Sequence, residues 1–209
     1  MYLSRVKLDM NKRNTQIALS SLNRFHGAIE EAFEYQSGER ERKLWRIDRL
    51  KSDTYLLILS RAVPKLDKIV QQFGMSPSDC LSKSYDILLD RIEEGSNWRF
   101  RLVANPTMCK ANGKEERGKR VALVSSKSQK EWLIKQAEKN GFLLDENMFE
   151  TTEAKWVNFC KRGEHRVRAI SVTYEGILCV QNVEKFKNAL LQGLGREKAY
   201  GMGLLTIMR

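Results

Sequence analysis

The order of two hydrophobic repeat patterns constrains the fold more than any other feature of the chain. Apolar and polar side chains alternate, as in β-strands, in residues 1–9, 44–50, 54–60 and 85–92. Apolar side chains recur at helical spacing in residues 17–33 and in a segment that Pro64 opens and that ends near Gly74. The first half therefore predicts the order strand, helix, strand, strand, helix, strand, with a hairpin at residues 51–53. This is the order of a ferredoxin-like sheet with two helices on one face.

The second half repeats this order less cleanly. Strand patterns occupy residues 98–104, 121–124, 156–160, 166–174, 177–180 and 204–208. Helical patterns occupy residues 129–139 and 183–192, and Glu175-Gly176 predicts a turn. We predict an α+β chain of two tandem ferredoxin-like (RRM-like) βαββαβ domains, residues 1–94 and 97–209. The polar segment between them is the expected boundary.

The charge of the chain is basic and unevenly distributed. The 209 residues carry a formal net charge of +11, and 42% of them are hydrophobic, which is enough for a packed core. Residues 1–95 hold 16 Lys and Arg against 14 Asp and Glu, whereas residues 96–209 hold 21 against 12. This excess in the second half favours a polyanionic partner there, and a merely soluble basic protein is the alternative.

The cysteines and the apolar runs exclude several classes of protein. The four cysteines are widely spaced and form no Cys-x-x-Cys pair, so neither a zinc site nor a disulfide framework is indicated. The longest apolar runs fall well short of the roughly 18 residues that a transmembrane helix needs. We expect a cytoplasmic protein with reduced thiols and no membrane partner.

A glycine-rich segment lies at residues 193–203, before the last strand pattern. Its glycines allow positive φ and close approach of the backbone to a phosphate, and two cations accompany them. Its candidate RNA-binding residues are Gly193, Gly195, Arg196, Lys198, Gly201 and Gly203. Paired glycines also serve helix ends and hairpin bends, which is the structural alternative.

Two basic runs accompany this segment in the second half. One is a loop over residues 109–120 with Lys110, Lys114, Arg117, Lys119 and Arg120. The other is a hairpin tip with Lys161, Arg162, Arg166 and Arg168. Long cationic side chains reach phosphates, and arginine adds bidentate contacts, so the two runs together favour nucleic acid over solvated loop charge.

The chain has only two histidines, and His26 is the candidate for acid–base chemistry. On a helix it shares a face with Asn23 and Glu30, and neighbouring apolar residues anchor that helix. A lone helical histidine is often structural, and this alternative stays open. His165 lies in the basic hairpin, where contact with a polyanion is expected. No metal motif is visible, so the remaining option is chemistry without a metal or cofactor.

Several motifs occur in the same order in a known family. They are Met1-Tyr2-Leu3-Ser4-Arg5-Val6, the helix with His26, Phe100-Arg101-Leu102-Val103-Ala104-Asn105-Pro106, Glu175-Gly176-Ile177-Leu178 and the segment from Gly193 to Leu205. Over nearly its whole length the chain resembles CasE, the CRISPR repeat-processing endoribonucleases of subtype I-E.

The resemblance implies a metal-independent endoribonuclease that needs no cofactor. It would cut each repeat of a CRISPR precursor transcript at the 3′ base of its stem-loop by 2′-OH attack and leave a 2′,3′-cyclic phosphate. It would then keep the product RNA as a subunit of the Cascade complex. The family's Tyr-x-x-His corresponds to Asn23-Arg24-Phe25-His26, so the catalytic candidates are His26 and Asn23. Because Asn23 cannot exchange a phenolic proton, a neighbouring cation or Ser20 is a candidate for the second role.

Two other functions stay open at this level. One is a non-catalytic scaffold of the same fold that binds RNA hairpins, which the missing tyrosine makes plausible. The other is a DNA-binding regulator. Ferredoxin-like sheets host many functions, so the fold alone does not favour an enzyme.

Overall fold

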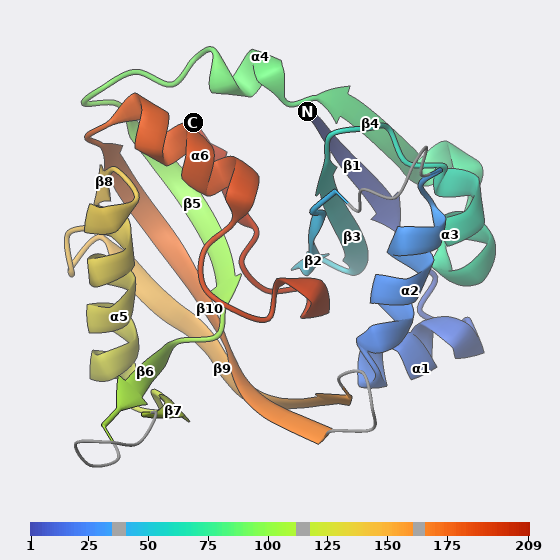
Figure 1. Cartoon of the computed structure of the whole chain (residues 1–209). Coiled ribbons are helices and arrows are strands. Elements are labelled where there is room, and N and C mark those ends of the chain that lie inside the picture. The colour runs from blue at the N-terminus through green and yellow to red at the C-terminus, as the bar shows by residue number, and fades with distance from the viewer. Residues whose placement is uncertain (35–40, 112–117, 161–165) are drawn as a thin grey trace.

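Two large antiparallel sheets with their helices, and one two-stranded ribbon, make up the described part of the protein (Figure 1). The structure is a computed structural model, and it describes residues 1–34, 41–111, 118–160 and 166–209. The strands of the first sheet all precede residue 85, and those of the second all follow residue 96. A division into domains at 1–94 and 97–209 is consistent with this and stays a prediction.

The first sheet has the strand order β2-β3-β1-β4, with every described neighbour antiparallel. Its strands are β1 (Tyr2–Lys7), β2 (Leu44–Leu50), β3 (Asp53–Ser60) and β4 (Cys80–Ser84). Its helices are α1 (Arg13–Ser20), α2 (Asn23–Glu31) and α3 (Leu66–Phe73), and the short η1 (Pro77–Asp79) and α4 (Asp86–Leu89) flank β4. This order confirms the predicted ferredoxin-like fold and the hairpin between β2 and β3.

The second sheet has the order β11-β5-β10-β8, and β9 also pairs with β10. Its strands are β5 (Asn97–Ala104), β8 (Phe142–Leu143), β9 (Phe149–Cys160), β10 (Arg166–Val180) and β11 (Leu205–Met208). The helices α5 (Ser126–Lys139) and α6 (Val183–Gln192) lie on one face of it (Figure 1). A separate ribbon joins β6 (Thr107–Lys110) to β7 (Lys119–Ala122), and η2 (Lys198–Tyr200) lies between the sheets.

The helix expected over residues 17–33 is broken into α1 and α2. Ser21 leaves helical geometry at φ −137° and ψ 85°, and its N–H still bonds to the carbonyl oxygens of Ile17 and Ala18. Serine favours such local bonding at helix ends. The break makes Asn23 the first residue of a new helix, and it therefore lies at a helix end rather than in mid-helix.

Two predictions from the sequence are wrong. Residues 85–92 are not a strand: the fourth strand is β4, and α4 follows it. Tyr85, Leu89 and Ile92 are buried at a spacing that suits a helical turn. The expected turn at Gly176 is also absent, because β10 runs through it. A Cβ there would lie 2.3 Å from the Met148 carbonyl oxygen, so this glycine permits close strand packing.

Each sheet packs its helices over a hydrophobic core, and the core of the second half also takes in Leu44 of β2 and Leu59 of β3. In the first half Phe25 of α2 is fully buried, and its ring lies 5.9 Å from that of Trp45 and 4.9 Å from that of Phe73. In the second half Phe142 and Phe186 bring α6 onto the sheet, with ring centroids 5.4 Å apart. Burial of these rings fixes α2 and α6, the two helices on either side of η2.

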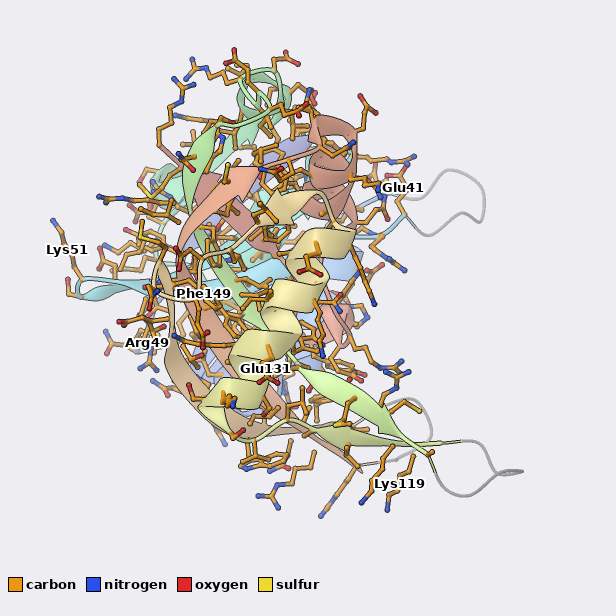
Figure 2. The ribbon with its side chains drawn as sticks, turned by 90° about the vertical axis from the view of Figure 1, so that its left-hand side faces the viewer. Glu41, Arg49, Lys51, Lys119, Glu131 and Phe149 are labelled. Atoms are coloured by element: carbon orange, nitrogen blue, oxygen red, sulfur yellow. The ribbon has the colours of Figure 1, made fainter. Side chains whose placement is uncertain are left out.

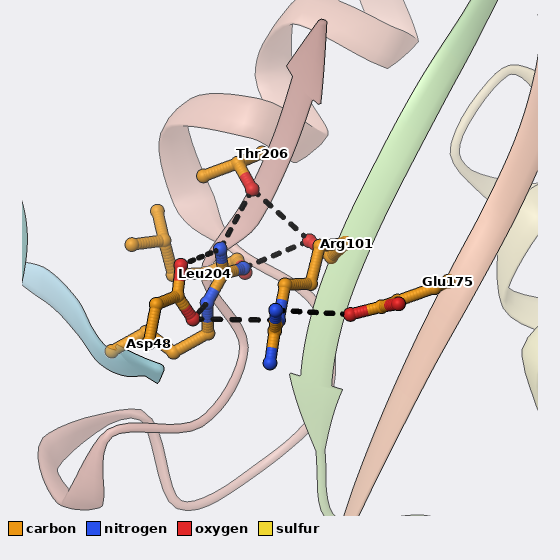
Figure 3. A network of polar contacts seen from close by, with 6 residues as sticks. Asp48, Arg101, Glu175, Leu204 and Thr206 are labelled. Carbon is orange, nitrogen blue, oxygen red and sulfur yellow. Dashed lines mark hydrogen bonds and ion pairs between the residues drawn. The ribbon is translucent and has the colours of Figure 1, made fainter. Parts of the chain in front are cut away.

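A buried arginine joins the two sheets. Arg46 of β2 is 2% exposed and donates two bonds of 2.7 Å to the Asp48 carboxylate. It also donates at 2.8 Å to the carbonyl oxygens of Arg101 and Leu204 and to Oγ1 of Thr206, all in the second half (Figure 3). Because buried donors must be satisfied, this network holds the edge of β2 against β5 and β11.

Candidate active site and nucleic-acid interface

An open cavity of about 670 Å³ lies where the two halves meet. One wall comes from α2 and the segment before β2, and the other from residues 195–200, which include η2. Its lining includes His26, Arg42, Lys43, Arg196, Lys198 and Tyr200. The cavity therefore combines an imidazole, a phenol and several cations, and Glu30, Glu41 and Glu197 add carboxylates to the same lining.

His26 faces this cavity from the first full turn of α2. Its side chain is partly buried, and the fully buried Phe25 next to it fixes the helix to the core. The His26 ring centroid lies 6.3 Å from that of Tyr200. The predicted imidazole thus lies on a rigid element and opens to solvent through the cavity, as a proton-transferring group requires.

Asn23 lies one helical turn before His26 and does not line the cavity. Its Nδ2 donates at 2.6 Å to the carbonyl oxygen of Cys160, at the end of β9. Its Oδ1 is buried without a hydrogen-bond partner among the described residues. Ser20, the other candidate, donates to the Gln16 carbonyl oxygen within α1 and also lies outside the cavity lining. The structure gives Asn23 an anchoring contact between α2 and β9.

Tyr200 is a residue of this cavity that the sequence reasoning missed. Its ring stacks on Phe159 of β9, with centroids 3.8 Å apart and an interplanar angle of 20°. Its hydroxyl donates at 3.2 Å to the Cys160 carbonyl oxygen, the same acceptor that Asn23 uses. The only sequence signal for Tyr200 is that it is the one aromatic residue of the glycine-rich segment. The glycines of that segment suggest backbone contacts, so the aromatic side chain was not singled out.

Packing explains three of the glycines in residues 193–203. At Gly193 and Gly203, both at positive φ, a Cβ would lie 2.7 Å from a backbone carbonyl oxygen of the same loop. At Gly201, φ +77°, a Cβ would lie 2.8 Å from the Trp45 ring. Gly195, also at positive φ, lines the cavity. The first three close the loop and seat it on β2, and the predicted contact of all four with phosphate stays a prediction.

The cations of the cavity differ in whether their charge already serves a contact within the protein. The Lys198 ammonium donates at 2.7 and 2.8 Å to the carbonyl oxygens of Gln192 and Gly193, where α6 ends. Burial, and secondarily the nearby Arg42 charge, lowers the pKa of Lys198 below its ordinary value. The Lys198 ammonium therefore stabilises the loop that follows α6. Arg196 and Arg42 both line the cavity.

The described part of the two basic runs lies at one end of the molecule. Lys110, Lys119 and Arg120 are exposed on the β6–β7 ribbon, and Figure 2 shows Lys119 at its end. Arg166 and Arg168 are exposed where β10 begins, and Arg168 lies 4.4 Å from the centroid of the Trp156 ring. Four predicted contacts lie outside the described residues, as does His165: Lys114, Arg117, Lys161 and Arg162.

The end of the β9–β10 hairpin that carries Arg166 lies next to residues of the site, because Arg166 pairs with Cys160. Figure 1 shows the hairpin extending toward α1 and α2, and Asn23 and Tyr200 both bond to its Cys160. Across the described ranges, no three His, Cys, Asp or Glu side chains gather as a metal-ion site would need. Nor does any helix there have the length and apolarity to span a bilayer.

The chain is similar to proteins of one kind. It is 28% identical to CRISPR-associated endoribonuclease Cse3 of Thermus thermophilus, over 99% of each chain. The structure of CRISPR endoribonuclease Cse3 bound to 19 nt RNA matches with a TM-score of 0.83 and 25% identity, over 100% of each chain.

A more distant match shows the fold alone. The CRISPR-associated protein Cas6e of Escherichia coli K-12 has 18% identity and a TM-score of 0.60, over 99% of this chain and 98% of that one.

A sequence model of the family described as "CRISPR associated protein" matches residues 1–209. The chain belongs to this family of CRISPR-associated proteins.

Proposed function

We propose that the protein is a CRISPR endoribonuclease that cuts precursor RNA within each repeat, at the 3′ base of its stem-loop. The observation that carries this proposal is the cavity in which His26 faces the cation-bearing loop at residues 195–200. The exposed cations of the β6–β7 ribbon and of the start of β10 supply charge for an RNA stem, because A-form RNA is recognised by shape and phosphate contacts. The similarity to an endoribonuclease over nearly the whole chain supports the same activity.

The chemistry requires no nucleophile from the protein. The ribose 2′-oxygen forms a bond to phosphorus, the bond from phosphorus to the 5′-oxygen breaks, and a 2′,3′-cyclic phosphate is left. The 2′-oxygen loses a proton and the leaving 5′-oxygen gains one. In this proposal His26, which lines the cavity, accepts the first proton or donates the second. Arg196 and Arg42, which line the same cavity, stabilise charge on the phosphoryl oxygens.

This reaction proceeds without a metal ion, because alignment, proton transfer and charge stabilisation come from the residues named. We further infer that the protein keeps its product and joins the other Cascade subunits. The basic surface on the β6–β7 ribbon and on β10 suits retention of a hairpin RNA, since several phosphate contacts slow dissociation. A non-catalytic RNA-hairpin scaffold is the second candidate, which the asparagine at position 23 favours.

Cleavage of cognate repeat RNA in EDTA separates the two candidates. The enzyme is expected to cut once per repeat and to leave a cyclic phosphate, and a scaffold binds without cutting. A single deoxynucleotide directly upstream of the scissile bond should abolish cleavage, because it removes the nucleophile. Cutting of that substrate would refute 2′-OH attack, and a strict requirement for a divalent ion would refute the metal-independent reaction.

Replacement of the imidazole tests the assigned site. His26→Ala is expected to lower the single-turnover cleavage rate by about 10²–10⁴-fold, the usual contribution of a general acid or base, with RNA affinity retained. Glu31→Gln, an exposed position at the end of the same helix, is the control and should cleave normally. Wild-type cleavage by the His26→Ala protein would remove His26 from the mechanism.

A further inference from the structure

Trp45 of β2 contacts both elements that form the walls of the cavity, although its own side chain is not part of the cavity lining. It is 1% exposed, and its ring centroid lies 5.9 Å from that of Phe25, which precedes His26 on α2. Its Nε1 donates a hydrogen bond of 3.2 Å to the Ala199 carbonyl oxygen of η2. One buried side chain therefore touches both walls.

The contact of this indole with the loop combines close packing with the hydrogen bond. A Cβ at Gly201, the residue after η2, would lie 2.8 Å from the Trp45 ring, so the backbone there is in close contact with the indole. The Nε1–H group can only donate, and once buried it needs an acceptor, which Ala199 supplies. The backbone on both sides of Tyr200 is therefore seated on Trp45.

The two walls differ in how far they can move. Phe25 is fully buried, and its ring centroid also lies 4.9 Å from that of Phe73, so core packing fixes α2. The residues of η2, by contrast, are only partly buried. A smaller side chain at position 45 should therefore leave α2 in place and let the loop shift.

We propose that Trp45 is a positioning residue for cleavage, whose indole sets the spacing between His26 and the loop at residues 195–200. It neither touches the RNA nor transfers a proton. It acts through Phe25 on one wall and through Ala199 and Gly201 on the other. A shift of about 1 Å far from the reacting atoms can slow a reaction by about 10²-fold, so this spacing matters for the rate. The inference rests on the proposed function and adds a positioning role to it.

Trp45→Phe tests the inference, because it keeps an aromatic ring against Phe25 and removes the N–H donor and the second ring. We expect the single-turnover cleavage rate at saturating RNA to fall roughly 10- to 100-fold, through loss of alignment. The affinity for repeat RNA should stay near wild type, because Trp45 does not line the cavity.

Trp98→Phe is the matched control. Trp98 is 2% exposed, its Nε1 donates at 2.9 Å to Oγ of Ser96, and neither residue lines the cavity. Both variants lose one indole hydrogen bond and the same side-chain volume, so their melting temperatures should fall by similar amounts. Only Trp45→Phe should lose cleavage rate, which separates positioning from a general loss of stability.

A second substitution covers the case in which Trp45→Phe does not fold. Benzothienylalanine at position 45 keeps both rings and lacks only the N–H donor. It should lower the cleavage rate roughly 2- to 10-fold, the range of one hydrogen bond. An unchanged rate for this protein overturns the inference.

The remaining outcomes are also decisive. A Trp45→Phe rate within about 2-fold of the Trp98→Phe rate overturns the inference, because misplacement of the loop should cost more. A loss that appears in RNA affinity instead of in the rate overturns it as well. If the wild-type protein itself does not cleave repeat RNA, the proposed function fails. Failure of the inference alone leaves wild-type cleavage intact, so the two failures are distinguishable.

Discussion

At the scale of single residues, the loop that carries Tyr200 depends on one close contact. Gly201 follows Tyr200 at φ +77°, and its α-carbon approaches the ring of Trp45, which is 1% exposed. A side chain there would meet both the left-handed backbone penalty and a rigid aromatic neighbour. Gly27 is the contrasting case, since it lies within α2 with no atom near its hypothetical Cβ.

These two glycines give opposite predictions for one substitution. Gly201→Ala should lower the free energy of unfolding by about 2 kcal/mol or more, from strain and overpacking against Trp45. Gly27→Ala should raise it by about 0.5–1 kcal/mol, because alanine is the better helix former. Urea unfolding followed by far-UV circular dichroism measures both. Equal effects of the two would contradict this account of the loop.

At the scale of elements, the β9–β10 hairpin is where we expect RNA binding and the cavity to meet. Its exposed Arg166 is the cross-strand partner of Cys160, whose carbonyl oxygen accepts from Asn23 and Tyr200. Arg168 lies over the Trp156 ring, so part of its interaction is already with that ring. We therefore expect Arg166 to be the clearer phosphate ligand.

Removal of that charge should weaken RNA binding in a defined way. Arg166→Gln is expected to lower affinity for repeat RNA and to reduce the slope of log K against log salt by about one unit, as for one lost phosphate contact. Arg91→Gln, exposed next to α4 at the far end of the molecule, makes the same charge change and should leave both values unaltered (Figure 1). Fluorescence anisotropy over a salt series measures them. An unchanged slope for Arg166→Gln would show that the RNA binds to another surface.

The spacing of apolar residues predicted most helices and strands, because these residues are the ones buried in the structure. The hairpin of β2 and β3 and the helix α6 follow directly from spacing and turn residues. The strand β4 was missed because it is short and little of it is buried. Gly176 was misread because a glycine that admits a neighbouring strand resembles a turn glycine in sequence.

The site was only half predictable for a similar reason. His26 could be named from its type and its helix. Tyr200 and Arg42 could not, because tertiary contacts alone bring them to the cavity. Sequence spacing carries no information on such distant pairs.

At the scale of the whole molecule, the Arg46 network determines whether the two halves stay in register. Its guanidinium is satisfied by Asp48 and by acceptors of the second half. Arg101 extends the network, since it lies 3.4 Å from Asp48 and 3.0 Å from Glu175 (Figure 3). Loss of one member leaves a buried charge without its partner.

Arg46→Ala is therefore expected to lower the free energy of unfolding by about 3–5 kcal/mol, because Asp48 loses its main partner while it stays buried. Arg61→Ala is the control. Its pair with Glu41, at 3.6 Å, is solvent-exposed, and the unfolding midpoint should hardly move. Chemical denaturation of both variants measures the difference, and a small effect at Arg46 would show that the network does not hold the halves together.

The cavity has one wall from each half of the chain, and this has a consequence during synthesis. His26 leaves the ribosome early in synthesis. The loop at residues 195–200, which faces it, is made only after most strands of the second sheet. On the proposed mechanism we therefore expect a nascent chain to cut no RNA until translation has delivered both walls.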